Sequence, residues 1–404
     1  MPFDTALTRK LGIKIPVVQG GLQWVAYAEL AAAVSNAGGL GIINALTQPD
    51  PEWLRAEIRK TKKLTNKPFG VNITLLPALK VPDYGAFTRV IIEEGIKIVE
   101  TAGNNPGPVI SKLKDSGITV IHKATTIKHA RSAVKMGVDI LSIDGFECAG
   151  HVGETDLTSL ILLSRARQEF PDTIFIASGG FADGQGLAAA LSLGAAGINM
   201  GTRFVCTVEA PVHANVKKAI VEGGEEQTAI LLRRWKNTTR LYSNTRTDAA
   251  LKIERESVKG EFSEVAPLVS GVKGREVLVE GDINRGVWYA GQVMGLIHDI
   301  PTCHELLSRI EREAEESLSK VRSLVVKESP IEDMRVASRF CGINAGSIGA
   351  WPNIGATAVV DSVGQSYEGK QPSIVKPNNP STPRTWTPKQ PQPHRERCHL
   401  ALMS

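Results

Sequence analysis

The sequence has few cysteines and none of the spacings that bind metal. Its 404 residues include five cysteines, and no two of them form a Cys-x-x-Cys pair. A zinc cage is not expected, because structural zinc sites use closely spaced cysteine and histidine ligands. The odd number and wide spacing also argue against a disulfide framework and are typical of a reducing compartment. The cysteines are Cys148, Cys206, Cys303, Cys341 and Cys398.

Aromatic residues, basic clusters and long apolar runs are also scarce. Aromatics make up 5% of the chain, and the net charge of +5 comes from basic residues scattered among acidic ones. The lack of a basic block with interleaved aromatics argues against nucleic-acid binding. No window approaches the roughly 18 continuous apolar residues of a membrane span. The N-terminus has no apolar signal core, so we expect a cytoplasmic protein.

Residues 13–205 alternate short apolar runs with longer amphipathic stretches. The runs are rich in valine and isoleucine and apolar on both faces, as buried parallel strands are. Eight such runs with helices between them predict an α/β fold, a closed TIM (β/α)8 barrel. An open doubly wound sheet is the alternative, but the first strand is not followed by Gly-x-Gly-x-x-Gly. The expected strands begin near Ile15, Leu40, Phe69, Ile96, Thr119, Asp139, Ile174 and Gly197.

The chain changes character twice after the eighth expected strand. Residues 209–285 hold polar helical stretches and no clear strand, so we interpret them as a helical insertion, or lid, over the barrel mouth. The barrel takes residues 1–208 and is completed by final helices in 286–327. Residues 328–404 are rich in proline and polar residues. Because such a composition cannot bury enough apolar surface to fold, we predict a mostly disordered tail.

Two expected strand ends carry glycines beside a hydroxyl. Ser178-Gly179-Gly180 follows the seventh strand, and Gly201-Thr202 follows the eighth. Glycine lets backbone N–H groups approach an anion, and the helix expected after the first loop points its N-terminus the same way. Phosphate sites of (β/α)8 barrels lie after strands 7 and 8. These loops therefore predict a cradle for the phosphate of a nucleotide-like cofactor.

A histidine lies on the same predicted rim. The loop after the sixth expected strand contains His151, and its flanking glycines leave no bulky neighbour to hide the imidazole. Such a histidine can accept a proton near neutral pH, so we interpret His151 as a catalytic base. Asp144 and Glu147 either orient it or remain solvated loop charges. A nucleophilic pair of Cys148 and His151 is the alternative, although such near neighbours on a loop seldom make a competent pair.

Three further strand ends add groups to this rim. Lys123 ends the fifth expected strand, where its charge suits an anionic heterocycle or a phosphate oxygen. Gly21 and Gln23 follow the first strand, and Asn72 and Thr74 belong to the third; these residues can pack on a flat ring and hydrogen-bond its heteroatoms. One phosphate site without a second fingerprint for an adenosine half favours FMN over a nicotinamide as the tightly held cofactor.

Taken together, these motifs resemble the nitronate monooxygenase (2-nitropropane dioxygenase) family of FMN-dependent TIM barrels. The resemblance covers about residues 5–326 and rests on segments 16–21, 38–41, 145–153, 178–186 and 200–204. It implies that His151 is the catalytic base beside the flavin. It also implies that FMN is held by Gly21, Leu22, Gln23, Thr74, Lys123, Gly150, Ser178, Gly179, Gly180, Gly201 and Thr202, to which we add Asp144.

The resemblance implies oxidation of alkyl nitronates or nitroalkanes by O2 to carbonyl compounds and nitrite. Many relatives, including an enoyl-acyl-carrier reductase branch, have Gly-Gly-His where this chain has Ala149-Gly150-His151. Segments 20–25 and 144–151 are most similar to a subgroup associated with NAD(P)H:quinone reductase activity, which is the alternative function. We expect a small-molecule substrate, nitronate or quinone, and we allow for NAD(P)H as co-substrate and for a homodimer. A non-catalytic barrel that binds a phosphate ligand, or a protein through its tail, is the remaining alternative.

Overall fold

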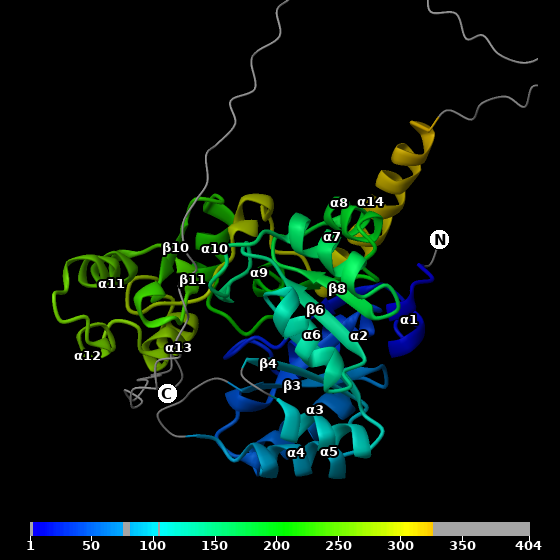
Figure 1. Cartoon of the computed structure of the whole chain (residues 1–404), viewed down its shortest axis with the longest axis horizontal. Helices are drawn as coiled ribbons and strands as arrows, with labels where there is room; N and C mark the ends of the chain where they lie inside the picture. Colours follow the sequence, from blue (N-terminus) through cyan, green and yellow to red (C-terminus); the bar gives the residue numbers. More distant parts are fainter. Residues whose placement is uncertain (1–2, 76–80, 104–105, 326–404) are drawn as a thin grey trace, which may run out of the picture. The chain divides into compact units, whose positions relative to one another are not determined.

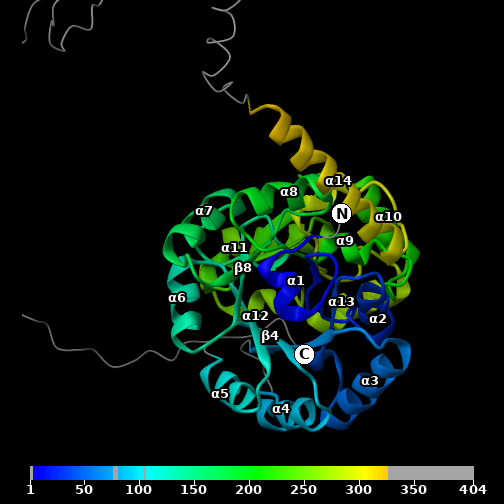
Figure 2. The ribbon, with the colours of Figure 1, turned by 90° about the vertical axis from the view of Figure 1, so that its right-hand side faces the viewer.

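Eight parallel strands close into a barrel in the computed structural model, which describes residues 3–75, 81–103 and 106–325. Helices alternate with the strands along the chain and surround them as a ring in Figure 2. The predicted TIM (β/α)8 barrel is confirmed. Its strands, in order, are β1 (Val17–Gln19), β2 (Leu40–Asn44), β3 (Phe69–Leu75), β4 (Ile98–Gly103), β5 (Thr119–Ala124), β6 (Ile140–Asp144), β8 (Ile174–Ser178) and β9 (Ile198–Met200).

The outer layer consists of the helices that connect these strands. The start of α3 shows how the sequence places them: Asp50 accepts hydrogen bonds from two backbone N–H groups of the first turn, and Pro51 opens the helix. The last helix, α14 (Cys303–Ser323), packs against α8 and α2 and then extends beyond the barrel (Figure 1). The other ring helices are α2 (Ala28–Asn36), α3 (Pro51–Leu64), α4 (Tyr84–Glu93), α5 (Gly107–Asp115), α6 (Ile127–Lys135), α7 (Ser159–Glu169) and α8 (Gly184–Ser192).

The barrel interior has an apolar layer and a polar layer. Side chains such as Ile98 and Ile121 form the apolar layer together with Leu7 of α1 (Ala6–Leu11), which lies at the centre of the ring in Figure 2. Side chains two residues apart share one face of a strand. Glu100 and Lys123 therefore also face the interior, one layer closer to the carboxyl ends of the strands. The polar layer lies where a barrel carries its active site.

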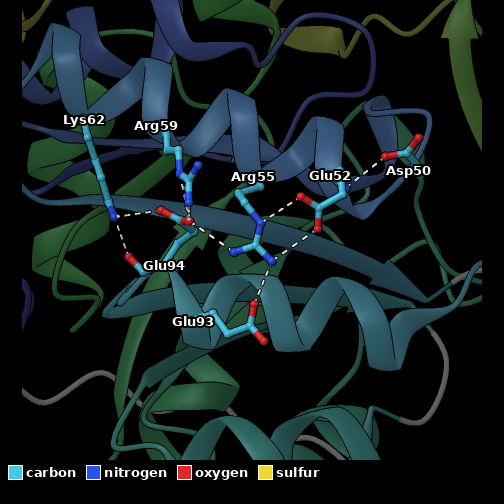
Figure 3. A network of polar contacts seen from close by, with 7 residues as sticks. All are labelled: Asp50, Glu52, Arg55, Arg59, Lys62, Glu93 and Glu94. Carbon is cyan, nitrogen blue, oxygen red and sulfur yellow. Dashed lines mark hydrogen bonds and ion pairs between the residues drawn. The ribbon is translucent and has the colours of Figure 1, made fainter.

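An ion-pair network joins α3 to α4 on the outside of the barrel (Figure 3). Arg55 donates to both Glu93 and Glu94, and Glu94 also contacts Arg59 and Lys62. The Glu94 side chain is 9% exposed, whereas that of Glu93 is 47% exposed. Burial alone raises the pKa of the Glu94 carboxyl, but the three basic partners together lower it below its ordinary value. Glu94 is therefore the centre of this network.

The segment 209–285 is not entirely helical, which corrects the sequence prediction. Strands β10 (Thr228–Leu231) and β11 (Thr239–Tyr242) are antiparallel, and β11 also pairs with β7 (Gly150–His151). The sequence showed no clear strand in this segment because strands this short have no clear period and form only through their pairing partners. The helices here are α10 (Ala214–Glu222), α11 (Thr245–Glu256), α12 (Phe262–Val265) and α13 (Gly271–Glu280).

The insertion has an apolar core of its own. Leu231 and Leu241 from its two strands pack with Phe262 and Val265 of α12. The boundaries assigned to barrel, insertion and tail stay predictions, and the predicted tail at 328–404 lies outside the described residues. Within the described ranges, no helix combines the length and apolar character needed to cross a membrane.

Candidate active site

A cavity of about 480 Å³ opens at the carboxyl ends of the barrel strands. Loops after the barrel strands form one part of its wall and the insertion forms another. Its volume lies in the usual range for cofactor and ligand pockets, about 300–1,000 Å³. The structure brings all of the predicted site residues together here, while their roles stay predictions. They are Gly21, Leu22, Gln23, Thr74, Lys123, Asp144, Gly150, His151, Ser178, Gly179, Gly180, Gly201 and Thr202.

The loop after β8 suits an anion. Gly179 and Gly180 both have φ of 86°, and a Cβ atom on Gly179 would lie 2.8 Å from the carbonyl oxygen of Gly145. A larger residue would therefore be strained and crowded at this position. Within the described part of the chain, no acceptor contacts the backbone N–H of either glycine. Consecutive free N–H groups in such a backbone make an anion-binding concavity, which fits the predicted phosphate.

The α8 N-terminus and the two hydroxyls are already engaged. Asp183 accepts from the backbone N–H of Gly186 at 2.7 Å, and the carboxylate of Glu313 accepts from that of Gly184 at 3.1 Å. Carboxylates thus already use two of the N–H groups at this helix end, and its predicted orientation toward the phosphate stays a prediction. The Ser178 hydroxyl hydrogen-bonds Asp144, and Thr202 Oγ1 accepts from the backbone N–H of Gly291 at 3.0 Å. In the described part of the chain, the N–H groups of Gly179 and Gly180 therefore remain donors of this loop that have no partner.

A fully buried carboxylate connects three of the rim strands. Glu100 of β4 accepts hydrogen bonds from the backbone N–H of Gly21 at 2.9 Å, Asn72 Nδ2 at 2.7 Å and Asn199 Nδ2 at 3.0 Å. The loop after β1 thereby has a fixed position over the polar layer. Sequence reasoning missed Glu100 because a single acidic residue within an apolar strand carries no motif. Its place two residues after Ile98, on the interior face, was the available signal.

Lys123, which is half-buried, and the buried Asp144 form an ion pair in the cavity wall. Lys123 Nζ lies 3.3 Å from Asp144 Oδ2, and Asp144 Oδ1 accepts a hydrogen bond from Ser142 at 3.0 Å. Burial alone lowers the pKa of the Lys123 ammonium, but the charges of Asp144 and Glu100 raise it above its ordinary value. Lys123 is therefore a permanent cation on the cavity wall.

Asp144 and Glu147 neither orient His151 nor remain solvated loop charges, which were the two expectations for them. Asp144 pairs with Lys123, and the Glu147 carboxylate accepts from the backbone N–H of Ser159 at 3.0 Å, at the start of α7. Both carboxylates are bound within the structure, so neither is a solvated loop charge. The reason is that β5 brings Lys123 within reach of Asp144, and α7 brings its N-terminus within reach of Glu147.

His151 lies in β7 and is half-buried on the cavity wall. Burial lowers its pKa to about 4, although a hydrogen bond with the Asn237 side chain and the charge of Glu154 act in the opposite direction. The imidazole is therefore neutral at pH 7 and able to accept a proton. Asn237 comes from the insertion, and no local motif connects it to His151 in the sequence.

Cys148 is not suited to nucleophilic attack. Burial raises the pKa of its thiol to about 12, so it is protonated at neutral pH. The alternative of a nucleophilic pair of Cys148 and His151 therefore loses its support. Tyr289 is half-buried and also lines the cavity, and desolvation raises the pKa of its hydroxyl to about 12. Sequence reasoning missed Tyr289, which follows the insertion.

The insertion contacts the β1 loop across the cavity. Arg275 of α13 lies over the ring of Trp24, with 4.9 Å between its guanidinium carbon and the ring centroid. Trp24 has φ of 62°, a conformation that costs a non-glycine residue free energy and clusters at functional sites. Both Trp24 and Gly274 of α13 line the cavity. The insertion, which lies beside the barrel in Figure 1, thus forms part of the cavity wall.

A family model described as nitronate monooxygenase matches residues 4–313. The chain belongs to the nitronate monooxygenase family. The resemblance seen in its motifs is thereby confirmed, and the protein is an oxidoreductase.

Individual members of the family and related structures show the range of this similarity. The chain is 36% identical to the (3aS,4S,5R,7aS)-5-hydroxy-7a-methyl-1-oxo-octahydro-1H-indene-4-carboxyl-CoA dehydrogenase of Mycobacterium tuberculosis, over 80% of this chain and 100% of that protein. It is 28% identical to a nitronate monooxygenase of Paraburkholderia phytofirmans, over 78% and 97% of the two chains. The solved structure of FabK from Thermotoga maritima superposes with a TM-score of 0.74 at 34% identity, over 80% of this chain and 100% of that one.

Proposed function

We propose that this nitronate monooxygenase family member is an FMN-dependent enzyme that oxidises alkyl nitronates and nitroalkanes with O2 to carbonyl compounds and nitrite. The observation that carries the proposal is the neutral imidazole of His151 on the wall of the same cavity as the free N–H groups of Gly179 and Gly180. The similarity to the nitronate monooxygenase of Paraburkholderia phytofirmans supports it. A small-molecule substrate follows from the size of the cavity.

The residues present fit FMN. The N–H groups of Gly179 and Gly180 would hold the phosphate, and Lys123 would place its positive charge near the ring system. Gly21, fixed by Glu100, provides a flat backbone surface for the ring. When bound, FMN would supply the oxidation of the nitronate, with O2 as the final electron acceptor.

His151 would generate the reactive anion from a neutral nitroalkane. Its free ring nitrogen takes the proton from the carbon next to the nitro group, and the electron pair of that C–H bond moves onto the nitro oxygens. A positioned general base of this kind contributes about 10²–10⁴-fold to the rate. Lys123 is a fixed positive charge in the same cavity, and such a charge stabilises a developing anion.

Kinetics of a His151→Ala variant test the assignment. We expect turnover of neutral nitroethane to fall by about 10²–10⁴-fold, because the proton must leave without a base. Turnover of preformed propyl nitronate should fall far less, since that anion has already lost its proton, and the bound flavin should remain. An unchanged rate with nitroethane would remove the proposed role of His151.

Anaerobic mixing with electron donors tests the substrate class. We expect propyl nitronate to bleach the flavin absorbance of the purified protein. Rapid bleaching by NADH, with none by the nitronate, would favour the NAD(P)H:quinone oxidoreductase alternative. A protein that stays colourless after incubation with FMN would contradict the flavoenzyme itself.

Dehydrogenation of a CoA thioester is a second candidate. It is favoured by the 36% identity that extends over the full length of the carboxyl-CoA dehydrogenase from Mycobacterium tuberculosis. The same anaerobic assay separates the two candidates when a cyclic acyl-CoA replaces the nitronate. Bleaching by the thioester alone would favour the second candidate.

A further inference from the structure

One hydroxyl in the cavity wall has no part in the motifs or in the reaction proposed above. Tyr289 follows the insertion, is half-buried and lines the cavity. Within the described ranges its hydroxyl has no hydrogen-bond partner, and its oxygen is open to the cavity and not sealed inside the protein. We propose that Tyr289 is a catalytic residue whose hydroxyl donates a hydrogen bond to a nitro oxygen of the substrate. The proposal rests on the proposed function.

The Tyr289 hydroxyl is available as a donor, whereas two other hydroxyls of the cavity wall are engaged. Thr74 Oγ1 donates to Asn72 Oδ1 at 2.7 Å, and Thr238 Oγ1 donates to Glu154 Oε2 at 2.6 Å. Burial raises the pKa of Tyr289 to about 12, so its hydroxyl keeps its proton at pH 7. A protonated phenol without a partner can donate to a bound ligand.

Tyr289 lies beside the main chain that carries His151. A Cβ atom on Gly150 would lie 3.8 Å from Cδ1 and 3.9 Å from Cε1 of the Tyr289 ring. Gly150 directly precedes His151 in β7, and all three residues line the cavity. The proposed base and the free hydroxyl therefore border the same part of the cavity, where the reacting carbon and its nitro group would bind.

The main chain on both sides of Tyr289 is fixed. The carbonyl oxygen of Trp288 accepts from the backbone N–H of Tyr242 at 2.9 Å, and the rings of these two residues stack with 4.2 Å between their centroids. On the other side, the backbone N–H of Gly291 donates to Thr202 Oγ1 at 3.0 Å. The segment is thus tied to the insertion at one end and to the barrel at the other. A donor held in this way needs little reorganisation when charge develops on a substrate oxygen.

The hydrogen bond from Tyr289 would strengthen during the proton transfer. When His151 takes the proton, the electron pair of the C–H bond moves onto the nitro group, and its oxygens become anionic. Tyr289 keeps its own proton and donates to one of these oxygens. Because hydrogen bonds to charged groups are stronger than those to neutral groups, the contact stabilises the transition state more than the bound nitroalkane.

Kinetics of Tyr289→Phe test the proposal, because this change keeps the ring beside Gly150 and removes only the hydroxyl. We expect kcat for nitroethane to fall about 10–100-fold, as loss of a hydrogen bond to a charged group predicts. Propyl nitronate is already anionic when it binds, so for this substrate we expect a rise in KM of similar size, with kcat retained. A merely structural role of the hydroxyl would not divide the effect between kcat and KM in this way.

Binding of butyrate gives a readout without turnover. Butyrate is not oxidised and carries a planar anionic group with two oxygens, as a nitronate does. Isothermal titration calorimetry of the full-length protein measures its Kd, which we expect Tyr289→Phe to raise about 10–100-fold. Tyr242→Phe is the matched control: it also removes one tyrosine hydroxyl, it keeps the ring on Trp288, and Tyr242 does not line the cavity. This variant should leave the Kd and the kinetic constants as they are.

The outcomes separate this proposal from the proposed function. An unchanged kcat for nitroethane or an unchanged Kd for butyrate in Tyr289→Phe would overturn the role of Tyr289, and so would equal losses in Tyr242→Phe. If the wild-type protein oxidised neither nitroethane nor propyl nitronate, the proposed function would fall. In that case the Kd for butyrate still decides whether Tyr289 donates to an anionic oxygen.

Discussion

Replacing Glu100 by alanine is expected to destabilise the protein more than any surface charge change. Glu100 has no exposed surface and is the partner of three N–H donors. Two of these, the Gly21 backbone N–H and Asn72 Nδ2, have no other partner among the described contacts. The third donor, Asn199 Nδ2, also contacts Ser142 Oγ at 3.3 Å. The alanine variant therefore leaves two buried donors without an acceptor.

The magnitude follows from these contacts. Each buried donor left unsatisfied costs about 1–3 kcal/mol, so we expect Glu100→Ala to lower the free energy of unfolding by about 2–6 kcal/mol. Glu100→Gln retains one oxygen for Gly21 and Asn72 but turns an NH2 group toward Asn199. One mismatched contact gives an expected loss of about 1–3 kcal/mol. The order wild type, glutamine variant, alanine variant is the specific expectation.

Urea unfolding followed by far-UV circular dichroism measures these differences. Glu93→Gln serves as the control, because the Glu93 side chain is 47% exposed and its pair with Arg55 is a surface ion pair (Figure 3). Such a pair contributes about 0–1 kcal/mol. If Glu100→Ala lost no more stability than this control, the reasoning about the polar layer would be refuted. Equal losses of stability in the glutamine and alanine variants would refute the assignment of one Glu100 oxygen to Gly21 and Asn72 and of the other to Asn199.

Three other expectations concern the cavity and the outer network. Gly180→Ala should lose bound flavin, measured by absorbance after gel filtration. The control Gly117→Ala should keep its flavin, because Gly117 also has a positive φ but has open space around it. Equal flavin loss in both variants would contradict the anion site. Nitroethane turnover should stay constant from pH 7 to about 5 and fall only as His151 becomes protonated, near its pKa of about 4. If the turnover instead fell near the ordinary pKa of histidine, the imidazole of His151 would be exposed to solvent. Glu94→Gln should cost about 1 kcal/mol at pH 7 and low salt. The pKa of Glu94 in the folded state is lower than its ordinary value of 4.5. The stability difference between wild type and Glu94→Gln should therefore shrink as the pH falls below 4.5 and vanish near the folded-state pKa, where the carboxylate becomes protonated. A difference in thermal unfolding that does not change with pH would argue against the ion pairs.

The barrel and its rim were accessible from the sequence because their signals are local. Each barrel strand is a short apolar run, and each glycine loop sits directly after its strand. The carboxyl ends of parallel strands meet at one rim, so residues such as Lys123 and Gly179 could be placed together without knowing the helices.

The remaining features depend on contacts between distant segments. β10 and β11 are four residues each and are defined by their ladder, which the sequence does not display. The ion pair between Asp144 and Lys123 depends on the register of the neighbouring strands β5 and β6, and no sequence motif indicates that register. Asn237 reaches His151 only because the insertion folds back onto β7.

The pairing of β7 with β11 has a consequence for how the pocket opens. The main chain that carries His151 is itself a strand of the insertion sheet. Any hinge motion that swings this sheet away from the barrel would carry the imidazole along. Admission of solvent and withdrawal of the proposed proton acceptor would then be one event, so that the proposed base would face the substrate only while the sheet lies against the barrel.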